Sequence, residues 1–419
     1  MTTSTPLPPC ADGVDARRWP DVARVPRSTL RAPIARALAL QAFARLPIRV
    51  GTPDGGLPTA GGPDAPLMEL HRPDHFFRRL GRDGLIGFGE SHMAGDWSAP
   101  DLPALLTAFA DGYGALVPRP LQSLRAVALP TQPRADRGTR AGARRNIHRH
   151  YDLSNELFAL FLDETMTYSC ALFDAADPAG ADGLAAAQRR KIDRLLDLTG
   201  VGEGTELLEI GTGWGELAVR AARRGARVVS VTLSAQQRDL AAARVAEAGV
   251  ADRVQVRLSD YREVRGRFDA VVSVEMIEAV GERYWPVYFT ALDRLVRPGG
   301  RVGLQAITME HELMRASRSG YTWIHKYVFP GGLIPSVRAI EEQVDMRTAM
   351  RLVDRYAFGP DYAETLRLWR EAFAAAEAEV AALGFDSVFR RMWNFYLAYS
   401  EAGFRSGMLD VEQLILERA

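Results

Sequence analysis

Three glycines at alternate positions follow a short apolar segment and could bring a ligand close to the backbone. Residues 207–210 read Leu-Leu-Glu-Ile, and Gly211, Gly213 and Gly215 come directly after them. Glycine adopts positive φ without a Cβ penalty and allows close approach to the main chain. The spacing differs from the Gly-x-Gly-x-x-Gly that cradles a dinucleotide pyrophosphate. The pattern predicts a strand, a tight turn and a helix, and it disfavours a nicotinamide cofactor.

Polar side chains mark the ends of the first three predicted strands. Glu209 lies just before the glycine turn, Ser234 and Gln236 follow the second strand, and Asp260 follows the third. These groups suit the amino group, ribose and adenine of S-adenosylmethionine. A glycine turn alone is also typical of a purely structural turn, but three strand-end signals in order favour the cofactor. The predicted cofactor-binding residues here are Glu209, Gly211, Gly213, Gly215, Thr232, Leu233, Ser234, Gln237, Asp260 and Tyr261.

The segments that must position these residues alternate between strand and helix. Strands are predicted at residues 207–210, 227–232, 254–258, 268–274 and 301–307. Helices fill the intervals, and the one at 284–296 ends at a Pro-Gly-Gly sequence. This alternation predicts an α/β fold with a doubly wound, mostly parallel sheet. Ligands of such sheets bind at the carboxyl ends of the strands. The last hundred residues are expected to be mainly helical.

Composition narrows the class of protein. The chain has 419 residues, 47% of them hydrophobic, which is enough for two or three domains. Basic and acidic residues number 52 each, so no overall positive charge favours nucleic acid as a partner. The two cysteines, Cys10 and Cys170, indicate neither a disulfide framework nor a zinc site and fit a reducing cytoplasm. Without an apolar run of roughly 20 residues, the chain would have to meet any lipid at the membrane surface.

Four segments are predicted along the chain. Residues 1–30 form a flexible tail, 31–125 a small mixed α+β N-terminal domain, 126–150 a basic linker, and 151–419 the catalytic domain. Apolar residues at helical spacing between Ile34 and Leu46 predict a helix that either packs within its own domain or rests on a membrane.

A concentrated basic run stands out in this neutral chain. It contains Arg134, Arg137, Arg140, Arg144, Arg145, His148, Arg149 and His150. The planar guanidinium donates two hydrogen bonds at once, which suits phosphate. The run is therefore either a solvated linker or a phosphate-binding segment. For His150, both an anchoring role and a general-base role remain open.

Several ordered motifs resemble the cyclopropane fatty acyl phospholipid synthase family, which includes the mycolic acid methyltransferases. Besides the glycine turn they occupy residues 150–155 (His-Tyr-Asp-Leu-Ser-Asn), 167–170 (Thr-Tyr-Ser-Cys), 231–237 (Val-Thr-Leu-Ser-Ala-Gln-Gln), 327–332 (Tyr-Val-Phe-Pro-Gly-Gly) and 358–362 (Phe-Gly-Pro-Asp-Tyr). The resemblance runs from about His148 to the C-terminus. It implies a class I, Rossmann-like S-adenosylmethionine methyltransferase with a helical elaboration around a lipid site, and it places Tyr168 and Ser169 over the cofactor.

The resemblance also implies a bicarbonate ion near the reacting carbons, where this sequence departs from the family. The ion's neighbours would be Cys170, Glu278, Tyr362 and a histidine. This chain has Gln305 in place of that histidine, and residues 275–281 read Glu-Met-Ile-Glu-Ala-Val-Gly where the family usually has Gly-x-x-Glu-His-x-Gly. The extra carboxylate, Glu275, makes the bicarbonate site doubtful.

The expected chemistry needs a base. An alkene attacks the sulfonium methyl and leaves a carbocation, from which a proton must be removed. Our hypothesis is that Glu275 supplies the base, while Glu278, Gln305, Cys170 and Tyr362 shape the pocket. The alternative is that Glu275 only hydrogen-bonds the cofactor or a nearby loop. A nucleophilic role for Cys170 is disfavoured, because the reaction needs no covalent intermediate.

The remaining predictions concern product and partners. The sequences at 275–281 and 304–308 resemble the actinobacterial branch that makes 10-methylene fatty acyl groups, precursors of tuberculostearic acid, which works with a separate reductase. A cyclopropane product is the alternative. The expected substrate is an unsaturated, oleoyl-type phospholipid acyl chain, reached from the cytoplasm at the inner membrane face. A homo-oligomer, a different methyl acceptor and a non-catalytic lipid-binding role stay open.

The aromatic residues Tyr321, Trp323, Tyr327 and Phe329 either line an acyl tunnel or pack in a core.

Overall fold

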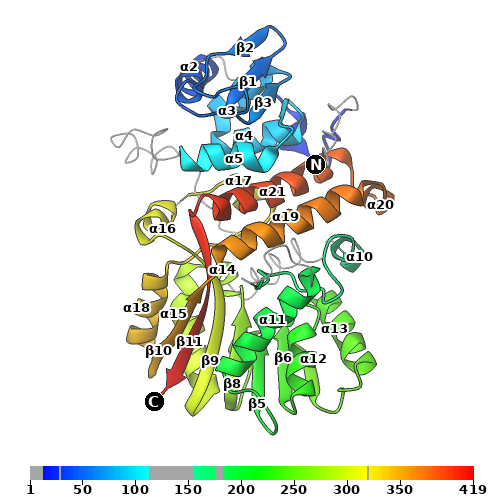
Figure 1. The fold of residues 1–419 in the computed structure, drawn as a ribbon, viewed down its shortest axis with the longest axis vertical. Helices are drawn as coiled ribbons and strands as arrows, with labels where there is room; N and C mark the ends of the chain where they lie inside the picture. The colour runs from blue at the N-terminus through cyan, green and yellow to red at the C-terminus, as the bar shows by residue number, and fades with distance from the viewer. Residues whose placement is uncertain (1–12, 28–29, 113–153, 175–182, 319) are drawn as a thin grey trace. The chain divides into compact units, whose positions relative to one another are not determined.

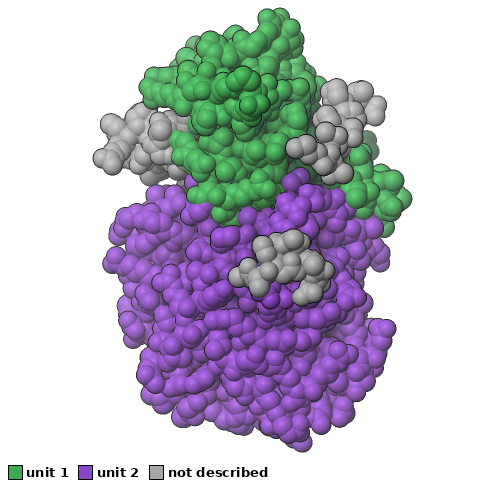
Figure 2. Space-filling view, in the orientation of Figure 1, with its two compact units in different colours: residues 1–131, 319–328, 373–406 green, residues 132–318, 329–372, 407–419 purple. Residues whose placement is uncertain are grey.

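The computed structural model describes residues 13–27, 30–112, 154–174, 183–318 and 320–419 (Figure 1). The chain divides into two compact units, which Figure 2 colours separately. Unit 1 comprises residues 1–131, 319–328 and 373–406, and unit 2 comprises residues 132–318, 329–372 and 407–419. The basic run at 134–150, including His150, lies outside the described residues.

Unit 2 is built on a seven-stranded sheet in the order β10-β11-β9-β8-β5-β6-β7. Its strands are β5 (Glu206–Ile210), β6 (Arg227–Thr232), β7 (Val254–Leu258), β8 (Phe268–Val274), β9 (Val296–Met309), β10 (Met350–Ala357) and β11 (Leu409–Arg418). Strands β5 to β9 are parallel to one another, whereas β11 runs antiparallel to both β9 and β10. The predicted doubly wound, mostly parallel sheet is confirmed.

Helices cover both faces of this sheet (Figure 1). One apolar cluster joins the sheet to α11 (Gly183–Leu198) and α12 (Glu216–Arg223), and another joins it to α15 (Trp285–Leu295) and α18 (Val337–Arg347). Leu207 and Leu208 are neighbours on β5 but belong to different clusters. Successive strand side chains point to opposite faces, so an almost continuous apolar strand is what a sheet covered on both sides requires.

Shorter helices complete unit 2. They are α10 (Asn155–Ala159), α13 (Ala235–Glu247), α14 (Ile277–Val280) and α16 (His311–Ser317), with 3-10 turns η2 (Tyr261–Glu263) and η3 (Glu282–Tyr284). The longer helix α19 (Gly359–Ala375) begins in unit 2, and its last three residues fall in unit 1.

Unit 1 contains a small sheet in the order β2-β1-β3-β4 with helices packed around it. The strands are β1 (Arg49–Thr52), β2 (Gly55–Leu57), β3 (Leu67–Leu70) and β4 (Trp97–Ser98). The helices are α1 (Pro20–Ala23), α2 (Arg31–Phe43), α3 (Pro73–Asp83), α4 (Leu85–Met93), α5 (Leu102–Asp111), α17 (Trp323–Tyr327), α20 (Glu377–Ala382) and α21 (Ser387–Arg405). This is a mixed α+β unit, as expected for the N-terminal region.

Residues from the C-terminal third complete this unit, although the sequence places them in the catalytic domain. Phe395 of α21 lies 6.2 Å from Phe88 and 4.7 Å from Trp323 by ring centroids. Trp323 is buried and its indole donates to the sulfur of Met93. Among the four aromatic residues singled out in the sequence, Trp323 and Tyr327 therefore pack inside unit 1, which is the core alternative.

Part of the predicted tail is also packed. Val22 of α1 is buried, and the guanidinium of Arg79 donates to the carbonyl of Val22 at 2.6 Å and to that of Asp21 at 3.0 Å. Arg79 is itself buried and paired with Asp96 at 2.9 Å. A buried guanidinium needs several acceptors, and the carbonyls of α1 supply them.

Across the described part of the chain, no helix combines the length and apolar character required to cross a bilayer.

Candidate active site

The glycine turn joins β5 to α12, and each of its three glycines, at every second position, has a positive φ angle. The angles are 99° at Gly211, 51° at Gly213 and 94° at Gly215. Among the residues that the structure describes, a Cβ built on Gly213 would meet no atom within 4 Å, whereas one on Gly211 would lie 2.8 Å from the side chain of Met276. The backbone at Gly213 thus borders open space at the carboxyl edge of the sheet, as a cradle for a ligand requires.

Glu209 lies beneath this turn. It is buried, and the hydroxyl of Ser230 on β6 is within hydrogen-bond distance of its carboxylate and 2.7 Å from the hydroxyl of Thr212. Burial raises the pKa of Glu209 to about 8, and the Ser230 hydrogen bond partly opposes that rise. The carboxylate therefore braces the turn in addition to the cofactor contact that the sequence predicts for it.

The segment after β6 uses its polar side chains locally. The hydroxyl of Thr232 donates to the side-chain oxygen of Gln237 at 2.8 Å, and the side chain of Ser234 caps α13 by accepting from the Gln237 amide at 3.2 Å. Leu233 is half-buried between them. This segment is pinned at the edge where the glycine turn also lies, because β5 and β6 are adjacent and parallel.

After β7, the carboxylate of Asp260 is occupied by its neighbour. Asp260 is buried and accepts from both the backbone amide and the guanidinium of Arg262, at 3.0 and 2.8 Å. Tyr261 packs edge-on against Tyr288, and burial raises its pKa to about 12. The sequence places Asp260 and Tyr261 correctly at a strand end but misses Arg262.

The irregular segment carrying Tyr168, Ser169 and Cys170 is held by several side chains. The ring of Tyr168 lies 5.1 Å from that of Phe158 and 5.1 Å from that of Trp369. Ser169 is buried, and its hydroxyl accepts from the ammonium of Lys191 at 2.6 Å. On the other side, Thr365 of α19 accepts from the amide of Ala171 at 3.2 Å.

Three donors converge on the carboxylate of Glu275. The backbone amide of Cys170 and the side-chain amide of Gln305 each donate to Oε1 at 2.9 Å, and the hydroxyl of Tyr362 donates to Oε2 at 2.6 Å. These residues come from four separate parts of the sequence. The structure thus brings together Glu275, Cys170, Gln305 and Tyr362, as the sequence predicts.

The backbone presents Glu275 in an unusual conformation. Glu275 follows the last residue of β8, its amide donates to the carbonyl of Gln305 at 2.7 Å, and its φ is +49°. Positive φ is uncommon outside glycine and costs energy that the surrounding structure must offset. Glu275 is half-buried as a residue, and hydrogen bonds to both carboxylate oxygens fix its side chain in position.

Glu278 is tied to the neighbouring strand. Its Oε1 accepts from the amide of Ile307 on β9 at 2.5 Å, and within the described residues its Oε2 has no hydrogen-bond partner. Burial, followed by the nearby charge of Glu275, raises the pKa of Glu278 to about 8. A carboxyl with a pKa of about 8 is mostly protonated at neutral pH, so Glu278 is uncharged there.

Burial raises the pKa of both the Glu275 carboxyl and the Cys170 thiol, but the charges and hydrogen bonds around the two groups differ. Burial raises the pKa of Glu275, while the ammonium of Lys191 and the three hydrogen bonds oppose the rise. Burial and the charge of Glu275 raise the pKa of Cys170, whose Sγ contacts the carbonyl of Ala171 at 3.1 Å. A nucleophile requires a thiolate, and a raised pKa disfavours the thiolate of Cys170.

Two functional neighbours escaped the sequence analysis. Lys191 and Gln413 are completely buried, and Gln413 donates to the side-chain oxygen of Gln305 at 3.1 Å. Both carry a signal that could have revealed them. Lys191 lies on the same helical face as Leu195, and Gln413 directly precedes the buried apolar run Leu414, Ile415 and Leu416 of β11.

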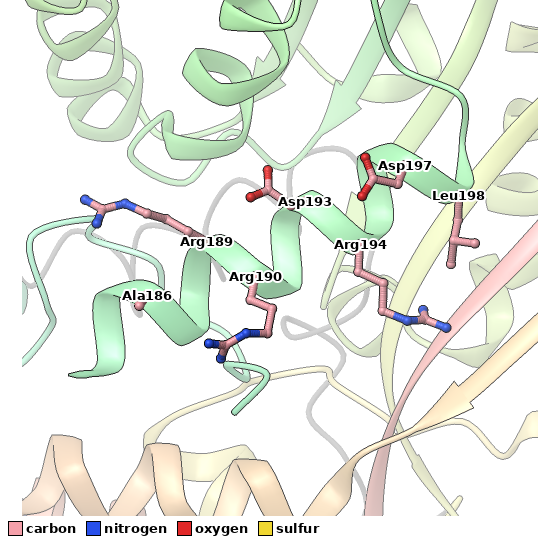
Figure 3. Close-up of a pocket in the computed structure, with 7 residues that line it drawn as sticks. All are labelled: Ala186, Arg189, Arg190, Asp193, Arg194, Asp197 and Leu198. Carbon is pink, nitrogen blue, oxygen red and sulfur yellow. The ribbon is translucent and has the colours of Figure 1, made fainter. Parts of the chain in front are cut away.

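A surface depression along α11 is separate from this cluster (Figure 3). Its lining residues are Ala186, Arg189, Arg190, Asp193, Arg194, Asp197 and Leu198. Several of their charges are already paired: Arg189 contacts Glu164 at 2.5 Å, Asp197 contacts Arg224 at 2.5 Å, and Arg194 contacts Asp354 at 3.1 Å. We therefore assign the chemistry to the Glu275 cluster and not to this depression.

The fold and the site together define an S-adenosylmethionine-dependent methyltransferase. An open glycine turn stands at the carboxyl edge of a doubly wound sheet, beside a carboxylate held in a fixed geometry. The chain belongs to the family described as mycolic acid cyclopropane synthetase, which matches residues 139–414. The resemblance seen in the sequence is confirmed.

Individual relatives narrow the comparison. The chain is 56% identical to the tuberculostearic acid methyltransferase UfaA1 of Mycobacterium tuberculosis, over 100% of this chain and 99% of that protein. It is 33% identical to the cyclopropane-fatty-acyl-phospholipid synthase of Escherichia coli, over 84% of this chain and 87% of that protein. A solved complex of mycolic acid cyclopropane synthase CmaA1 with SAH and CTAB is 30% identical, with a TM-score of 0.60, over 68% of this chain and 99% of that chain.

Proposed function

We propose that this chain methylates the double bond of an oleoyl-type acyl chain in a phospholipid and releases a 10-methylene acyl product. The observation that carries the proposal is the Glu275 carboxylate, which accepts from Cys170, Gln305 and Tyr362 in a half-buried position. The relative at 56% identity, named a tuberculostearic acid methyltransferase, supports a fatty acyl substrate.

Glu275 is suited to the proton removal that the reaction requires. S-adenosylmethionine, when bound, supplies a methyl group on a positively charged sulfur. Transfer of this methyl to one alkene carbon leaves a carbocation on the other. A hydride shift then moves the cation to the methyl-bearing carbon, and loss of a proton from the new methyl gives the methylene. The three hydrogen bonds to Glu275 favour its ionised form, which can accept that proton.

The same residues argue against a bound bicarbonate. The family resemblance assigns the ion to Cys170, Tyr362 and the position of Gln305, and all three already donate to Glu275. Glu278 is the fourth residue that the resemblance places beside the bicarbonate. A bound bicarbonate would therefore lie next to two carboxyl groups, those of Glu275 and Glu278. We infer that Glu275 takes the place of bicarbonate in this chain.

The cofactor site is assigned to the edge formed by the glycine turn and the end of β6. The open space above Gly213 and the positive φ angles of all three glycines fit a ligand held against the backbone. Tyr168 and Ser169, Glu209, residues 232–234, Gln237, Asp260 and Tyr261 are proposed to surround it. The contacts made by Glu209 and Asp260 within the protein suggest that these two residues mainly shape the site.

A cyclopropane product is the second candidate. It requires the same proton to leave from the same methyl while the ring closes, without the hydride shift. The 33% identity to a cyclopropane-fatty-acyl-phospholipid synthase favours it less than the closer relative favours the methylene. If the methylene forms, a separate reductase would convert it to a 10-methyl chain.

A membrane-facing role is proposed for α2 of unit 1. Leu30, Ile34 and Leu38 are spaced four residues apart and are 83%, 62% and 57% exposed. From residue 22 to residue 53 the chain has no acidic residue, and Arg31 and Arg36 are exposed on α2. An exposed apolar ridge flanked by arginines fits the surface of an anionic bilayer, consistent with a peripheral enzyme at the inner membrane face.

The direct test is transfer of a labelled methyl group. Purified protein would be incubated with S-adenosylmethionine carrying a ¹³C-methyl group and with vesicles of dioleoyl phosphatidylglycerol. We expect the label in the lipid fraction, and none with vesicles of the saturated distearoyl lipid. Equal labelling of both lipids, or labelling of neither, would contradict the proposed substrate.

A further inference from the structure

The carboxylate of Glu275 is the last member of a chain of hydrogen bonds that begins on α11. The guanidinium of Arg194 donates to the side-chain oxygen of Gln413 at 2.7 Å. The amide of Gln413 donates to the side-chain oxygen of Gln305 at 3.1 Å, and the amide of Gln305 donates to Glu275 at 2.9 Å. Gln413 and Gln305 are directly opposed on β11 and β9, so the chain crosses the sheet along its hydrogen-bonding direction.

We propose that Arg194 and Gln413 are positioning residues that fix the direction of this chain, so that the Gln305 amide always presents its N–H group to Glu275. The proposal rests on the base assignment made for Glu275 above. It extends that assignment to two residues that touch neither substrate nor cofactor.

The groups at the two ends of the hydrogen-bond chain, the guanidinium of Arg194 and the carboxylate of Glu275, allow only one orientation of the two glutamine amides between them. A guanidinium can only donate, so Gln413 must turn its oxygen to Arg194 and its amide to Gln305. Gln305 must then turn its oxygen to Gln413 and its amide to Glu275. Two backbone carbonyls favour the same orientation. The side-chain amide of Gln413 also donates to the carbonyl of Lys191 at 3.1 Å, and that of Gln305 donates to the carbonyl of Cys170 at 3.3 Å. A reversed amide would face acceptors with an oxygen.

Burial keeps water from substituting for any link. Gln413 is 0% and Gln305 is 1% exposed, so a reversed or broken link leaves polar groups unsatisfied. The outer end is also held, since Arg194 contacts Asp354 at 3.1 Å and lies 4.5 Å from the ring of Tyr356. In Figure 3 the side chain of Arg194 leaves α11 on the side opposite to Asp193 and Asp197, which pair with α12 instead.

The direction matters because it opposes the rise that burial causes in the pKa of Glu275. An N–H group facing the carboxylate stabilises its charge, whereas an amide oxygen would favour the protonated carboxyl. The other titratable groups facing Glu275 are Lys191 of α11, Cys170, Glu278 of α14 and Tyr362 of α19. Changes at Arg194 or Gln413 leave the side chains of all four in place, although Gln413→Met removes the hydrogen bond to the backbone carbonyl of Lys191. The chain therefore keeps the base active to lower pH than burial alone would allow.

The test follows the pKa of Glu275 itself. Protein labelled with ¹³C at the glutamate carboxyls is titrated by NMR, and the Glu275 signal is assigned by its loss in Glu275→Gln. We expect Gln413→Met, which is neutral, and Arg194→Gln, at the partly exposed end, to raise this pKa by about one unit. Arg194→Lys, which can still only donate, should restore it. Arg351→Gln, an exposed arginine on β10, serves as the charge-removal control.

Activity is the second readout. The acid limb of the kcat profile should move to higher pH in Gln413→Met and Arg194→Gln, with kcat lowered on the order of ten-fold at neutral pH and KM little changed. An unchanged Glu275 pKa in both folded variants would overturn the positioning role. If the pKa moves as expected but the wild-type protein does not methylate the lipid, the proposed function is wrong, and the positioning role of Arg194 and Gln413 is still supported. Thermal unfolding and SAH binding confirm that the variants are folded.

Discussion

At the scale of single residues, the carboxylate of Glu275 receives three hydrogen bonds and lies in the field of a buried lysine. The donors are Cys170, Gln305 and Tyr362, and the lysine is Lys191, which donates to Ser169 at 2.6 Å. Replacing the carboxylate therefore removes an acceptor around which the site is built. Two predictions follow from this geometry.

The first concerns the base. Glu275→Gln keeps the shape but loses the carboxylate, and we expect turnover to fall by about 10²- to 10⁴-fold while SAH affinity is retained. Glu275→Gly, which restores the residue usual in the family, should lose turnover as well but regain part of it when bicarbonate is added. Steady-state kinetics with and without bicarbonate measure both effects. Full turnover of Glu275→Gln would exclude the base role.

The second concerns pH. The Lys191 ammonium lowers the pKa of Glu275 against the rise caused by burial. Removing the charge in Lys191→Met should raise that pKa further. A protonated Glu275 cannot accept a proton, so activity is lost as pH falls through this pKa, and the acid limb of the kcat profile should move to higher pH. An unmoved acid limb in a variant that still binds SAH would mean that Lys191 serves packing alone.

At the scale of elements, the glycine turn must do two things at once. It reverses the chain between β5 and α12, and it leaves open space above Gly213. The Gly213→Ala variant should cost about 1–2 kcal/mol of stability for a side chain at positive φ, and should also weaken S-adenosylmethionine binding at least about ten-fold because the methyl group enters the ligand's space. Calorimetry of binding and thermal unfolding separate the two effects.

Gly249→Ala is the matched control. Gly249 has a φ of 70° and lies in the turn after α13, and a Cβ there also meets no atom of the described residues within 4 Å. The strain should be similar, yet the affinity should remain that of the wild type. Equal loss of affinity in both variants would mean that the turn acts only through stability.

Local pattern predicted the parallel strands well and the antiparallel ones poorly. Strands β6, β7 and β8 begin and end at the predicted residues, because each is a short apolar run between turn signals. Strands β10 and β11 lie in a region expected to be mainly helical. Their pairing depends on β9, whose Gln305 faces Gln413 across more than a hundred residues of sequence, and such a register is invisible to local periodicity.

The active-site residues also divide into those that the sequence revealed and those that it did not. The resemblance to the family brought Cys170, Glu278, Gln305 and Tyr362 to one place in the sequence analysis. In the structure they come from an irregular segment, α14, β9 and α19, and they meet at Glu275 or at β9. Lys191 and Gln413 were missed because both lie among other polar and charged residues, in α11 and β11, and the sequence does not show which of those residues is buried or what it contacts.

At the scale of the whole molecule, the active site and the exposed ridge of α2 belong to different units. We expect Ile34→Gln with Leu38→Gln to weaken co-sedimentation with anionic vesicles several-fold, because each removes exposed apolar surface from α2. Met346→Gln, at a 60% exposed position of α18, is the control for a general loss of surface hydrophobicity. Unchanged sedimentation of the double variant would rule out α2 as the membrane-facing element.

The central claim is the product that Glu275 and its neighbours select. The measurement that tests it most directly is ¹H NMR of the lipid after incubation of the protein with S-adenosylmethionine and dioleoyl phospholipid vesicles. We predict vinylidene protons of a 10-methylene chain, and their loss in Glu275→Gln. Cyclopropyl protons in place of the vinylidene signal would contradict the proposed product, and an unaltered oleoyl chain would contradict the proposed function itself.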